Sequence, residues 1–547
     1  MQDSLLPKDT KYLGGKEALS SNIMAALSVS YVLHSSLGPN ARSKLIIDSK
    51  NKVNVTNDGA TIVSLLQLDH PVAKMMRDIS LSQDFEIGDG TTSIIVFAGA
   101  LLSHCASLVM EGVHPNVLIS EIQKINNKAV SLLPELSVFF DKDELLEVLH
   151  KMASVSLSTK YVDKWNELLT KIAVDSILLV NRRRRRILVK KIEGISVEES
   201  KIEEGVVFSG KLVCGKKERL ENCGILLIES ICLPKPTSVK SRAIKTLVEE
   251  LEHLSTISYS FYEKTCKRMK EIKVEIVLVE EQNVPRELLL LFEAYGVCVV
   301  VVKGDLKKIS SLLSVPILYS LLGLDSNCCY RTPLFERYSK VCYSFDPVFH
   351  FFLMKMKKLS ADNLHDLFCL KTTKQICSVI LCAPTRKVLQ EVERSFNDAL
   401  SCLHSYLSQF GEEEIDLSKH SKVLCGAGCT EIKLISLLKE MKREFNLNVL
   451  SCYTESLKRI PFLLAQNSGA DPFELISLLE KRNREENFVG VDGVLGTLMD
   501  ARKVLEPLSL KSNILSSATE IVCAILRIDT VIVSKQIQHF AKPSFSK

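Results

Sequence analysis

The sequence predicts a multidomain α/β protein in which two helical ends enclose a mixed middle segment. Three observations support this prediction: the length of 547 residues, helical periodicity at both ends, and alternating strand and helix patterns in between. At about 150 residues per domain, the length corresponds to three or four units. Because both ends show helical periodicity and the middle alternates strand and helix patterns, we expect one domain built from both termini, with another inserted in it.

The N-terminal end is predicted to be mainly helical to about residue 150. Residues 16–38 carry apolar side chains at helical spacing until a Gly-Pro pair ends the pattern. The segments KLIID and VNVT, on either side of SKNK, predict a hairpin. A second helix follows the Asn-Asp-Gly turn at 57–59. A long apolar helix then begins at Thr91.

The middle of the chain alternates strand and helix patterns. RILVKKI, GVVFSG and CGILLIES are typical of strands, and a long charged helical segment follows them. VEIVLVEE and VCVVVV predict two buried strands separated by the helix PRELLLLFEAYG. This β-α-β-α-β order predicts an α/β domain over about residues 213–365. From residue 385 the pattern returns to long helices until about 532, and we expect a flexible tail after Val533.

The composition limits the classes of protein that the chain can belong to. With 46% hydrophobic and 25% charged residues, we expect a folded globular protein. A net charge of +5 against 70 basic and 65 acidic residues gives no support for nucleic-acid binding. The apolar stretches, such as GVCVVVV, are expected to be too short to cross a bilayer, so we expect no membrane partner. The 17 scattered cysteines and the polar N-terminus predict reduced thiols in a cytosolic or nuclear setting, and we favour a cytoplasmic location.

The first chemically informative motif is Gly-Asp-Gly-Thr-Thr-Ser at residues 88–93. Glycines at a helix start let backbone N–H groups approach a phosphate, and the three hydroxyls add donors. A carboxylate 4 Å from a phosphate is repelled by about 4 kcal/mol at an effective dielectric of 20, so Asp89 indicates a bridging Mg²⁺. The alternative is an ordinary helix N-terminus capped by Asp or Thr, and the motif by itself leaves both interpretations open.

Other local motifs give less. The P-loop pattern, the HExxH and GxSxG motifs and a pair of CxxC motifs do not occur. Cys425 and Cys429 bracket Gly-Ala-Gly, and this favours packed thiols over a zinc site. The arginine run Arg182–Arg186 favours a solvated loop between a helix and a strand over a basic docking patch.

Several motifs, taken together, resemble those of a known family. They are LGPNARSK (37–44), NDGATI (57–62), GDGTTS (88–93), ERSFNDAL (393–400), GAGCTEI (426–432) and LEPLSLKSNIL…ILRID (505–529). Their order and spacing resemble the group II chaperonins, which include the archaeal thermosomes and the eukaryotic cytosolic chaperonin CCT/TRiC. The resemblance extends from about residue 14 to 533.

The resemblance implies the group II chaperonin fold, with a mostly helical equatorial domain, an intermediate domain, and an inserted α/β apical domain with a helical protrusion. The expected segments are equatorial 1–144, intermediate 145–212, apical 213–366, intermediate 367–402, equatorial 403–533 and a flexible tail 534–547. The helix at 244–254 is expected to belong to the protrusion, which serves as a lid.

The resemblance also implies a pocket for ATP and Mg²⁺, with a role for each matching residue. Asp89 would hold the metal ion, and Lys160 would sense the γ-phosphate. Asp398 and Asp58 would act on the attacking water. The residues expected to contact the nucleotide are Gly38, Pro39, Gly90, Thr91, Thr92, Ser93, Gly426, Ala427, Gly428 and Glu506, the last at the ribose hydroxyls.

The implied function is that of an ATP-hydrolysing chaperone. The implied partners are paralogous subunits in a hetero-oligomeric double ring, eight per ring, and unfolded polypeptides such as cytoskeletal proteins. Ala41, Ser43, Ala427 and the Cys382-Ala383 pair depart from the usual family residues. Since the aspartates remain, we favour an active ATPase, with reduced affinity or turnover left open. The alternative is a chaperonin-like scaffold or assembly protein that does not hydrolyse ATP.

Overall fold

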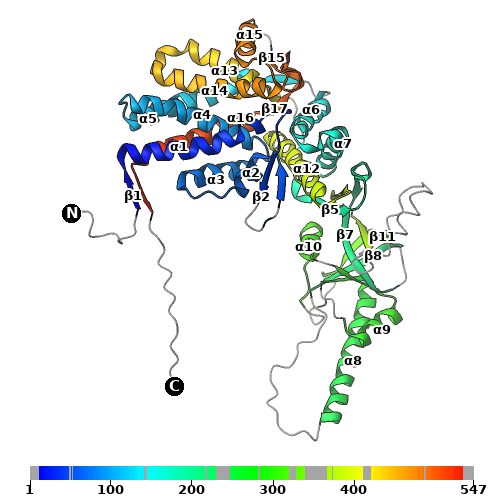
Figure 1. Ribbon diagram of the computed structural model, residues 1–547. Helices are drawn as coiled ribbons and strands as arrows, with labels where there is room; N and C mark the ends of the chain where they lie inside the picture. The colour runs from blue at the N-terminus through cyan, green and yellow to red at the C-terminus, as the bar shows by residue number, and fades with distance from the viewer. Residues whose placement is uncertain are drawn as a thin grey trace, which may run out of the picture. The chain divides into compact units, whose positions relative to one another are not determined.

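The computed structural model describes residues 11–47, 51, 53–140, 144–215, 219–229, 247–280, 284–302, 304–319, 324, 328–338, 366–372, 374–410, 421–485 and 488–533. The chain divides into two compact units, the first from residues 1–174 and 394–547 and the second from residues 175–393 (Figure 1). The predicted tail 534–547 and residues 244–246 of the predicted protrusion lie outside the described residues.

The first unit is mainly helical. Its helices are α1 (Gly15–Leu33), α2 (Gly59–Leu65), α3 (Pro71–Glu86), α4 (Thr91–Met110), α5 (Pro115–Leu132), α6 (Leu145–Ser158), α13 (Cys429–Glu440), α14 (Leu447–Ser468), α15 (Pro472–Arg484) and α16 (Leu508–Leu526). Two further helices, α7 (Asn166–Leu179) and α12 (Arg386–Leu407), run across the division between the units. Its short 3-10 helices are η1 (His34–Ser36), η2 (Leu133–Leu136), η4 (Tyr161–Trp165), η9 (Ser408–Phe410), η10 (Lys442–Glu444) and η11 (Ala501–Lys503), while η5 (Arg184–Arg186) and η6 (Val197–Glu199) belong to the second unit.

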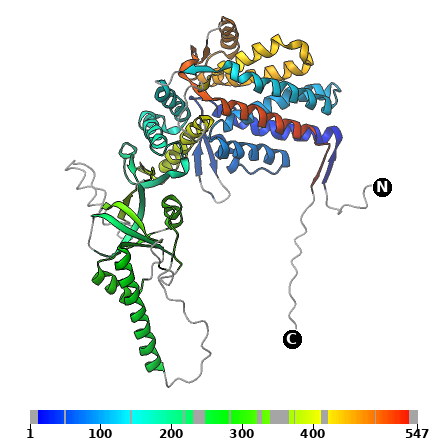
Figure 2. The same cartoon turned by 180° about the vertical axis from the view of Figure 1, so that it is seen from behind.

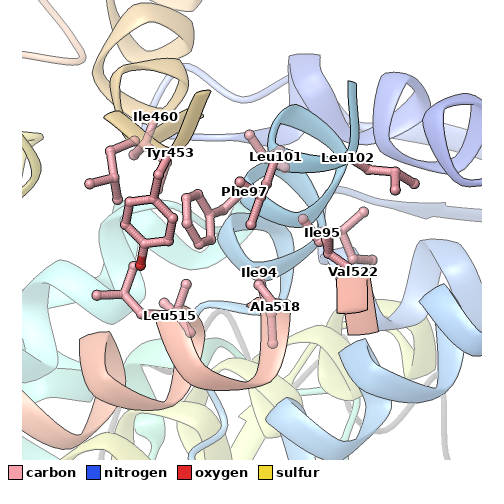
Figure 3. Close-up of a cluster of buried hydrophobic side chains, with 14 of the residues drawn as sticks. Ile94, Ile95, Phe97, Leu101, Leu102, Tyr453, Ile460, Leu515, Ala518 and Val522 are labelled. Atoms are coloured by element: carbon pink, nitrogen blue, oxygen red, sulfur yellow. The ribbon is translucent and has the colours of Figure 1, made fainter. Parts of the chain in front are cut away.

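Helix α4 lies at the centre of the first unit. It packs against α1, α3, α14 and α16, and Figure 3 shows side chains from α4, α14 and α16 meeting in one apolar cluster. The Phe97 and Tyr453 rings pack edge to face with centroids 5.7 Å apart. The buried Tyr453 hydroxyl donates to Asn126 Oδ1 at 3.0 Å, so its polar atom is satisfied inside the core.

Helix α4 also corrects an expectation. Among the described residues it is the one helix long and apolar enough, by length and composition, to span a bilayer, so the expectation that every apolar stretch is too short is wrong here. Ile94, Ile95, Phe97 and Leu101 are fully buried inside the helical unit. A core helix that is buried on nearly all sides needs apolar residues around its whole circumference, and α4 meets that need.

Local sequence explains where several helices begin. Asp58 caps α2 by accepting from the Thr61 N–H at 3.0 Å. Helices α3, α5 and α15 each begin with Pro at the first position, after a capping His70, His114 or Asp471. The predicted start of α4 at Thr91 and the predicted hairpin, now β2 (Lys44–Ile47) and β3 (Val53–Thr56), are confirmed.

The first unit also contains short strands that the sequence did not predict. They are β1 (Lys11–Gly14), β4 (Val138–Phe140), β14 (Ser421–Cys425), β15 (Val489–Val491), β16 (Leu498–Asp500), β17 (Leu505–Pro507) and β18 (Thr530–Val533). The predicted return to long helices between 385 and 532 is confirmed, with short strands between them that were not predicted. Strands of three to five residues are too short to show a period, and some of their partners are distant: β1 pairs with β18 (Figures 1 and 2), and β14 pairs with β4 and β17.

The second unit contains a closed barrel and a small sheet. The barrel strands are β7 (Val206–Cys214), β8 (Arg219–Ile228), β9 (Val274–Val279), β10 (Cys298–Val302), β11 (Tyr330–Tyr338) and β12 (Asp366–Lys371). The small sheet contains β5 (Ile187–Glu193), β6 (Lys201–Glu204) and β13 (Cys377–Ala383), and the helices are α8 (Leu247–Ile272), α9 (Arg286–Tyr295) and α10 (Leu306–Leu313).

The predicted β-α-β-α-β alternation is confirmed, because β8, β9 and β10 are parallel and α8 and α9 connect them. The closure of the barrel by antiparallel β7, β11 and β12 was not predicted. The predicted segment boundaries at 212/213 and 366/367 fall inside β7 and β12, and the division into equatorial, intermediate and apical segments stays a prediction. The Arg182–Arg186 run connects α7 to β5, as the loop interpretation predicted.

Candidate functional site

Loops from distant parts of the chain meet around one cavity in the first unit. Its volume is about 350 Å³. It is lined by residues next to α1, α2, α4, α6, α13, β15, β17 and α16. The predicted site residues that line it are Gly38, Pro39, Asp58, Asp89, Gly90, Thr91, Thr92, Ser93, Lys160, Ala427, Gly428 and Glu506. Asp398 and Gly426 do not line it.

The loop before α4 places Asp89 at the start of a buried helix. Gly88 and Gly90 have φ angles of 78° and 76°, which lie in the left-handed region that favours glycine. The Asp89 Oδ1 atom accepts from the Gly90 N–H at 2.7 Å, and Gln83 Nε2 donates to the Asp89 carbonyl at 2.9 Å. The N-cap of α4 is Gly90, which has no side chain, so the interpretation of this motif as an Asp or Thr cap is wrong.

The Asn-Asp-Gly turn before α2 lies directly against the Asp89 loop. Asp58 Oδ2 accepts from Thr61, and Thr91 Oγ1 lies 3.5 Å from Asp58 Oδ1. A Cβ atom on Gly59 would lie 2.6 Å from Thr92 Oγ1, so only a glycine lets the two loops approach this closely. Asp58 is therefore both a helix cap and part of the cavity wall.

Lys160 and Asp398 form an ion pair beside the cavity. The two side chains are 12% and 10% exposed. Burial raises the pKa of Asp398 to about 7, although the Lys160 ammonium opposes this shift. Burial by itself lowers the pKa of Lys160, but Asp398 and Asp89 outweigh it, and the pKa is raised. Asp398 thus lies behind the cavity wall, next to Lys160 and Gly88, and its raised pKa suits a general base.

The opposite wall is built around Glu506. Leu424 of β14 pairs with Glu506 of β17, and a Cβ atom on Gly426 would lie 2.5 Å from Glu506 Oε1. Gly426 therefore packs against the Glu506 carboxylate, which explains why it does not line the cavity. Lys511, which the sequence did not indicate, lies 2.9 Å from Glu506 Oε2.

Ala427 stands where the family usually has a glycine, and its backbone adopts the left-handed conformation that glycine favours. Its φ angle is 56°, a conformation that costs an alanine roughly 1–2 kcal/mol. Its methyl group packs close to Gly490, where a Cβ atom would lie 2.8 Å from the Ala427 Cβ. Gly428 has a φ of 79° and approaches Pro461 of α14 so closely that a Cβ atom would lie 2.6 Å from the proline Cβ.

Further cavity residues escaped the sequence analysis. They are mainly loop residues and one buried lysine: Asn57, Gly59, Thr159, Asp492, Gly493 and Lys511. Asn57 and Gly59 stand beside Asp58 in the same motif, so their position was a usable signal. Asp492 lies on the β15–β16 hairpin, where its carboxylate accepts from the Val494 and Leu495 N–H groups, and no pattern marked it.

The arrangement suits a phosphorylated ligand accompanied by a divalent cation. The start of α4 offers unpaired N–H groups, the Thr91, Thr92 and Ser93 hydroxyls add donors, and Lys160 adds a positive charge. The described residues contain no group of three or more His, Cys, Asp or Glu side chains that could hold a metal ion by themselves. Mg²⁺ usually takes one or two carboxylates and completes its shell with phosphate oxygens and water, so Asp89 fits that ion.

Comparison with known proteins agrees with the motifs. Residues 29–536 match the model of the TCP-1/cpn60 chaperonin family. The chain is 28% identical to a thermosome subunit of Pyrococcus horikoshii, over 98% of this chain and 94% of that protein. It is 28% identical to the thermosome subunit alpha of Saccharolobus solfataricus, over 98% and 95%, and 26% identical to the thermosome subunit beta of Archaeoglobus fulgidus, over 98% and 95%. The chain therefore belongs to the TCP-1/cpn60 chaperonin family and is a group II chaperonin.

Proposed function

We propose that this chain binds and hydrolyses Mg-ATP in the cavity of its first unit and uses the cycle to fold other polypeptides. One observation carries the proposal. Residues from position 38 to position 506, chosen from motifs that are far apart in the sequence, line one cavity of about 350 Å³, a volume within the usual range for small-molecule sites.

The phosphate end of the cavity is assigned to the start of α4. Gly90, Thr91, Thr92 and Ser93 would bind the phosphate oxygens, and Asp89 would hold Mg²⁺. When bound, the ion would neutralise part of the phosphate charge. Gly38 and Pro39 border the nucleotide at the end of α1, while Ala427 and Gly428 approach the ribose and base, with Gly426 as backing for Glu506.

Hydrolysis is assigned to Asp398 and Asp58. Asp398 accepts the proton of the attacking water, and Asp58 orients that water from the cavity wall. Because Asp398 is paired with Lys160, the pair must separate before Asp398 can act. When Lys160 engages the γ-phosphate, it releases Asp398, so binding of the intact nucleotide is coupled to activation of the base.

The chain is proposed to work as one subunit of a hetero-oligomeric double ring, eight per ring, in the cytoplasm. The stretches HPVAKMM, SQDFEIGDGTTSIIVFAGALL, GVHPNVLIS and AILRIDTVI resemble the delta subunit of CCT/TRiC most. A helical lid that includes α8 would close over unfolded polypeptide, cytoskeletal proteins among them. Sixteen chains of 61.1 kDa would weigh about 980 kDa in a closed assembly.

ATP binding, ATP turnover and the assembly state under native conditions test the proposal. Asp89→Ala is expected to weaken Mg-ATP binding itself, whereas Asp398→Ala is expected to bind ATP and not turn it over. The control is Asp471→Ala, which removes an exposed helix cap away from the cavity. This variant should bind ATP and hydrolyse it as wild type does. Equal turnover in wild type and Asp398→Ala would refute the assignment, and a free monomer under native conditions would refute the ring. A wild type that assembles and binds ATP without hydrolysing it would favour the scaffold alternative.

A further inference from the structure

A buried lysine in the wall of the cavity has no role in the site as assigned so far. Lys511 belongs to the first turn of α16, and its side chain is 8% exposed. Burial disfavours an ammonium group, and the positive end of the helix dipole disfavours it further. A lysine in such a place requires strong compensation from neighbouring carboxylates.

Two glutamates provide that compensation. Lys511 Nζ lies 2.5 Å from Glu431 Oε1 and 2.9 Å from Glu506 Oε2. Glu431 is 4% exposed and sits in the first turn of α13, where the helix dipole favours a negative charge. Glu506 is 18% exposed and belongs to β17. Lys511 therefore ties the neighbouring elements β17 and α16 to α13, whose Glu431 lies 80 positions earlier in the chain.

The Glu506 carboxylate is held from two sides. Lys511 contacts Oε2, and the backbone of Gly426 lies against Oε1. Lys511 and Gly426 thus border the carboxylate on two sides, and Glu506 also lines the cavity. Truncation of Lys511 would release one side and leave two buried carboxylates close together without a counter-charge.

We propose that Lys511 is a positioning residue that holds the Glu506 carboxylate ionised and directed at the cavity, and that it thereby sets the preference for a ribose over a deoxyribose nucleotide. This inference rests on the proposed function, in which Glu506 meets the ribose hydroxyls. An ionised carboxylate only accepts hydrogen bonds, so it recognises the hydroxyl donors of a ribose. A protonated Glu506 would lose that selectivity.

The other charged groups around Glu506 raise its pKa, as the loss of Lys511 would also do. Burial raises the pKa of Glu506, and the charges of Glu431 and, further away, Asp89 raise it too, whereas Lys511 lowers it. The thiols of Cys402 and Cys425 also lie near Glu506, and burial raises the pKa of both, so they stay neutral. Lys511 thus supplies the positive charge that favours the ionised form of Glu506.

The test compares the dissociation constants of Mg-ATP and Mg-2′-deoxy-ATP, measured by titration calorimetry on the full chain in its native assembly. A hydrogen bond to a charged acceptor corresponds to a preference for ATP of about ten- to a hundred-fold in wild type. In Lys511→Met the preference is expected to fall to about three-fold or less, and Lys511→Arg, which keeps the charge, is expected to retain most of it. In a Glu506→Gln background, Lys511→Met should change the preference no further.

The matched control is Lys458→Met. Lys458 also bridges two glutamates, Glu455 and Glu480, at 2.9 Å each, but it does not line the cavity. Its loss should leave the nucleotide preference unchanged. An unchanged preference in Lys511→Met overturns the inference, as does a wild type that binds both nucleotides equally. A wild type that binds neither nucleotide instead refutes the proposed function.

A second variant serves if Lys511→Met fails to fold. Glu431→Gln keeps Lys511 and Glu506 paired and removes the charge that raises the pKa of Glu506. As pH falls, wild type should lose its preference for ATP when Glu506 protonates. The variant should lose it at a lower pH, and a loss at the same or a higher pH overturns the inference.

Discussion

The Asp398 carboxylate is predicted to reduce the stability of the protein near neutral pH, and Asp398→Asn should remove that cost. Burial raises the pKa of this group from 3.8 to about 7 in the folded chain. A raised pKa means that the folded state binds the proton more tightly than the unfolded state. The associated stability is fully present below pH 3.8 and is lost as pH rises to about 7.

The magnitude follows from the two pKa values. With 3.8 in the unfolded and about 7 in the folded state, the cost of ionising Asp398 is about 2 kcal/mol at pH 5 and about 4 kcal/mol at pH 8. The folded value already includes the opposing effect of the Lys160 ammonium, which stabilises the ionised form. Relative to wild type, Asp398→Asn should therefore gain about 2–3 kcal/mol between pH 5 and pH 8.

The assay is thermal unfolding followed by fluorescence from pH 5 to pH 8, with ATPase activity measured in parallel. The melting temperature of the variant should exceed that of wild type by several degrees at pH 8, and the gap should narrow toward pH 5, while turnover is lost. Asp78→Asn, at a carboxylate that is 62% exposed on α3, is the control and should show no such trend. A pH-independent difference, or a variant less stable than wild type at pH 8, would refute the reasoning.

Three further predictions concern the cavity and the core. Gly59→Ala should weaken ATP binding and cost about 1–3 kcal/mol of stability, because its Cβ atom would lie 2.6 Å from Thr92 Oγ1. Calorimetry measures both effects, and a normal affinity for ATP would contradict the prediction. Phe97→Ala should cost about 3–5 kcal/mol in thermal unfolding because the ring is fully buried against Tyr453, whereas Phe85→Ala, at an 89% exposed ring, should cost almost nothing. Chelation of Mg²⁺ should remove most of the thermal stabilisation that ATP gives to wild type, and Asp89→Ala should respond little to chelation; equal responses would exclude Asp89 as the metal ligand.

Much of the fold could be predicted because its signals are local. The start of α4 at Thr91, the β2–β3 hairpin and the parallel β8, β9 and β10 follow from turn residues and apolar periodicity, which act over a few neighbouring positions. Short strands such as β14 and β17 could not be predicted, because a run of three to five residues has no measurable period. Their conformation depends on a partner strand elsewhere in the chain.

The candidate site likewise contains residues that the sequence could indicate and residues that it could not. Asp89 and its neighbours could be found in the sequence, because a phosphate loop needs glycines and hydroxyls at adjacent positions. Lys511 lies within the motif LEPLSLKSNIL, but the sequence indicated no role for it, since a single lysine on a helix is ordinary until its surroundings are known.

The sequence by itself determined the family of this protein and many of the residues that line its cavity, because both depend on short motifs whose chemistry is contiguous. Only the tertiary structure decided which charges meet. Lys160 and Asp398 are 238 positions apart, and Lys511 and Glu431 are 80 apart. Whether two such groups form an ion pair depends on how whole elements pack and on how much water they exclude, and this is not encoded at any single position.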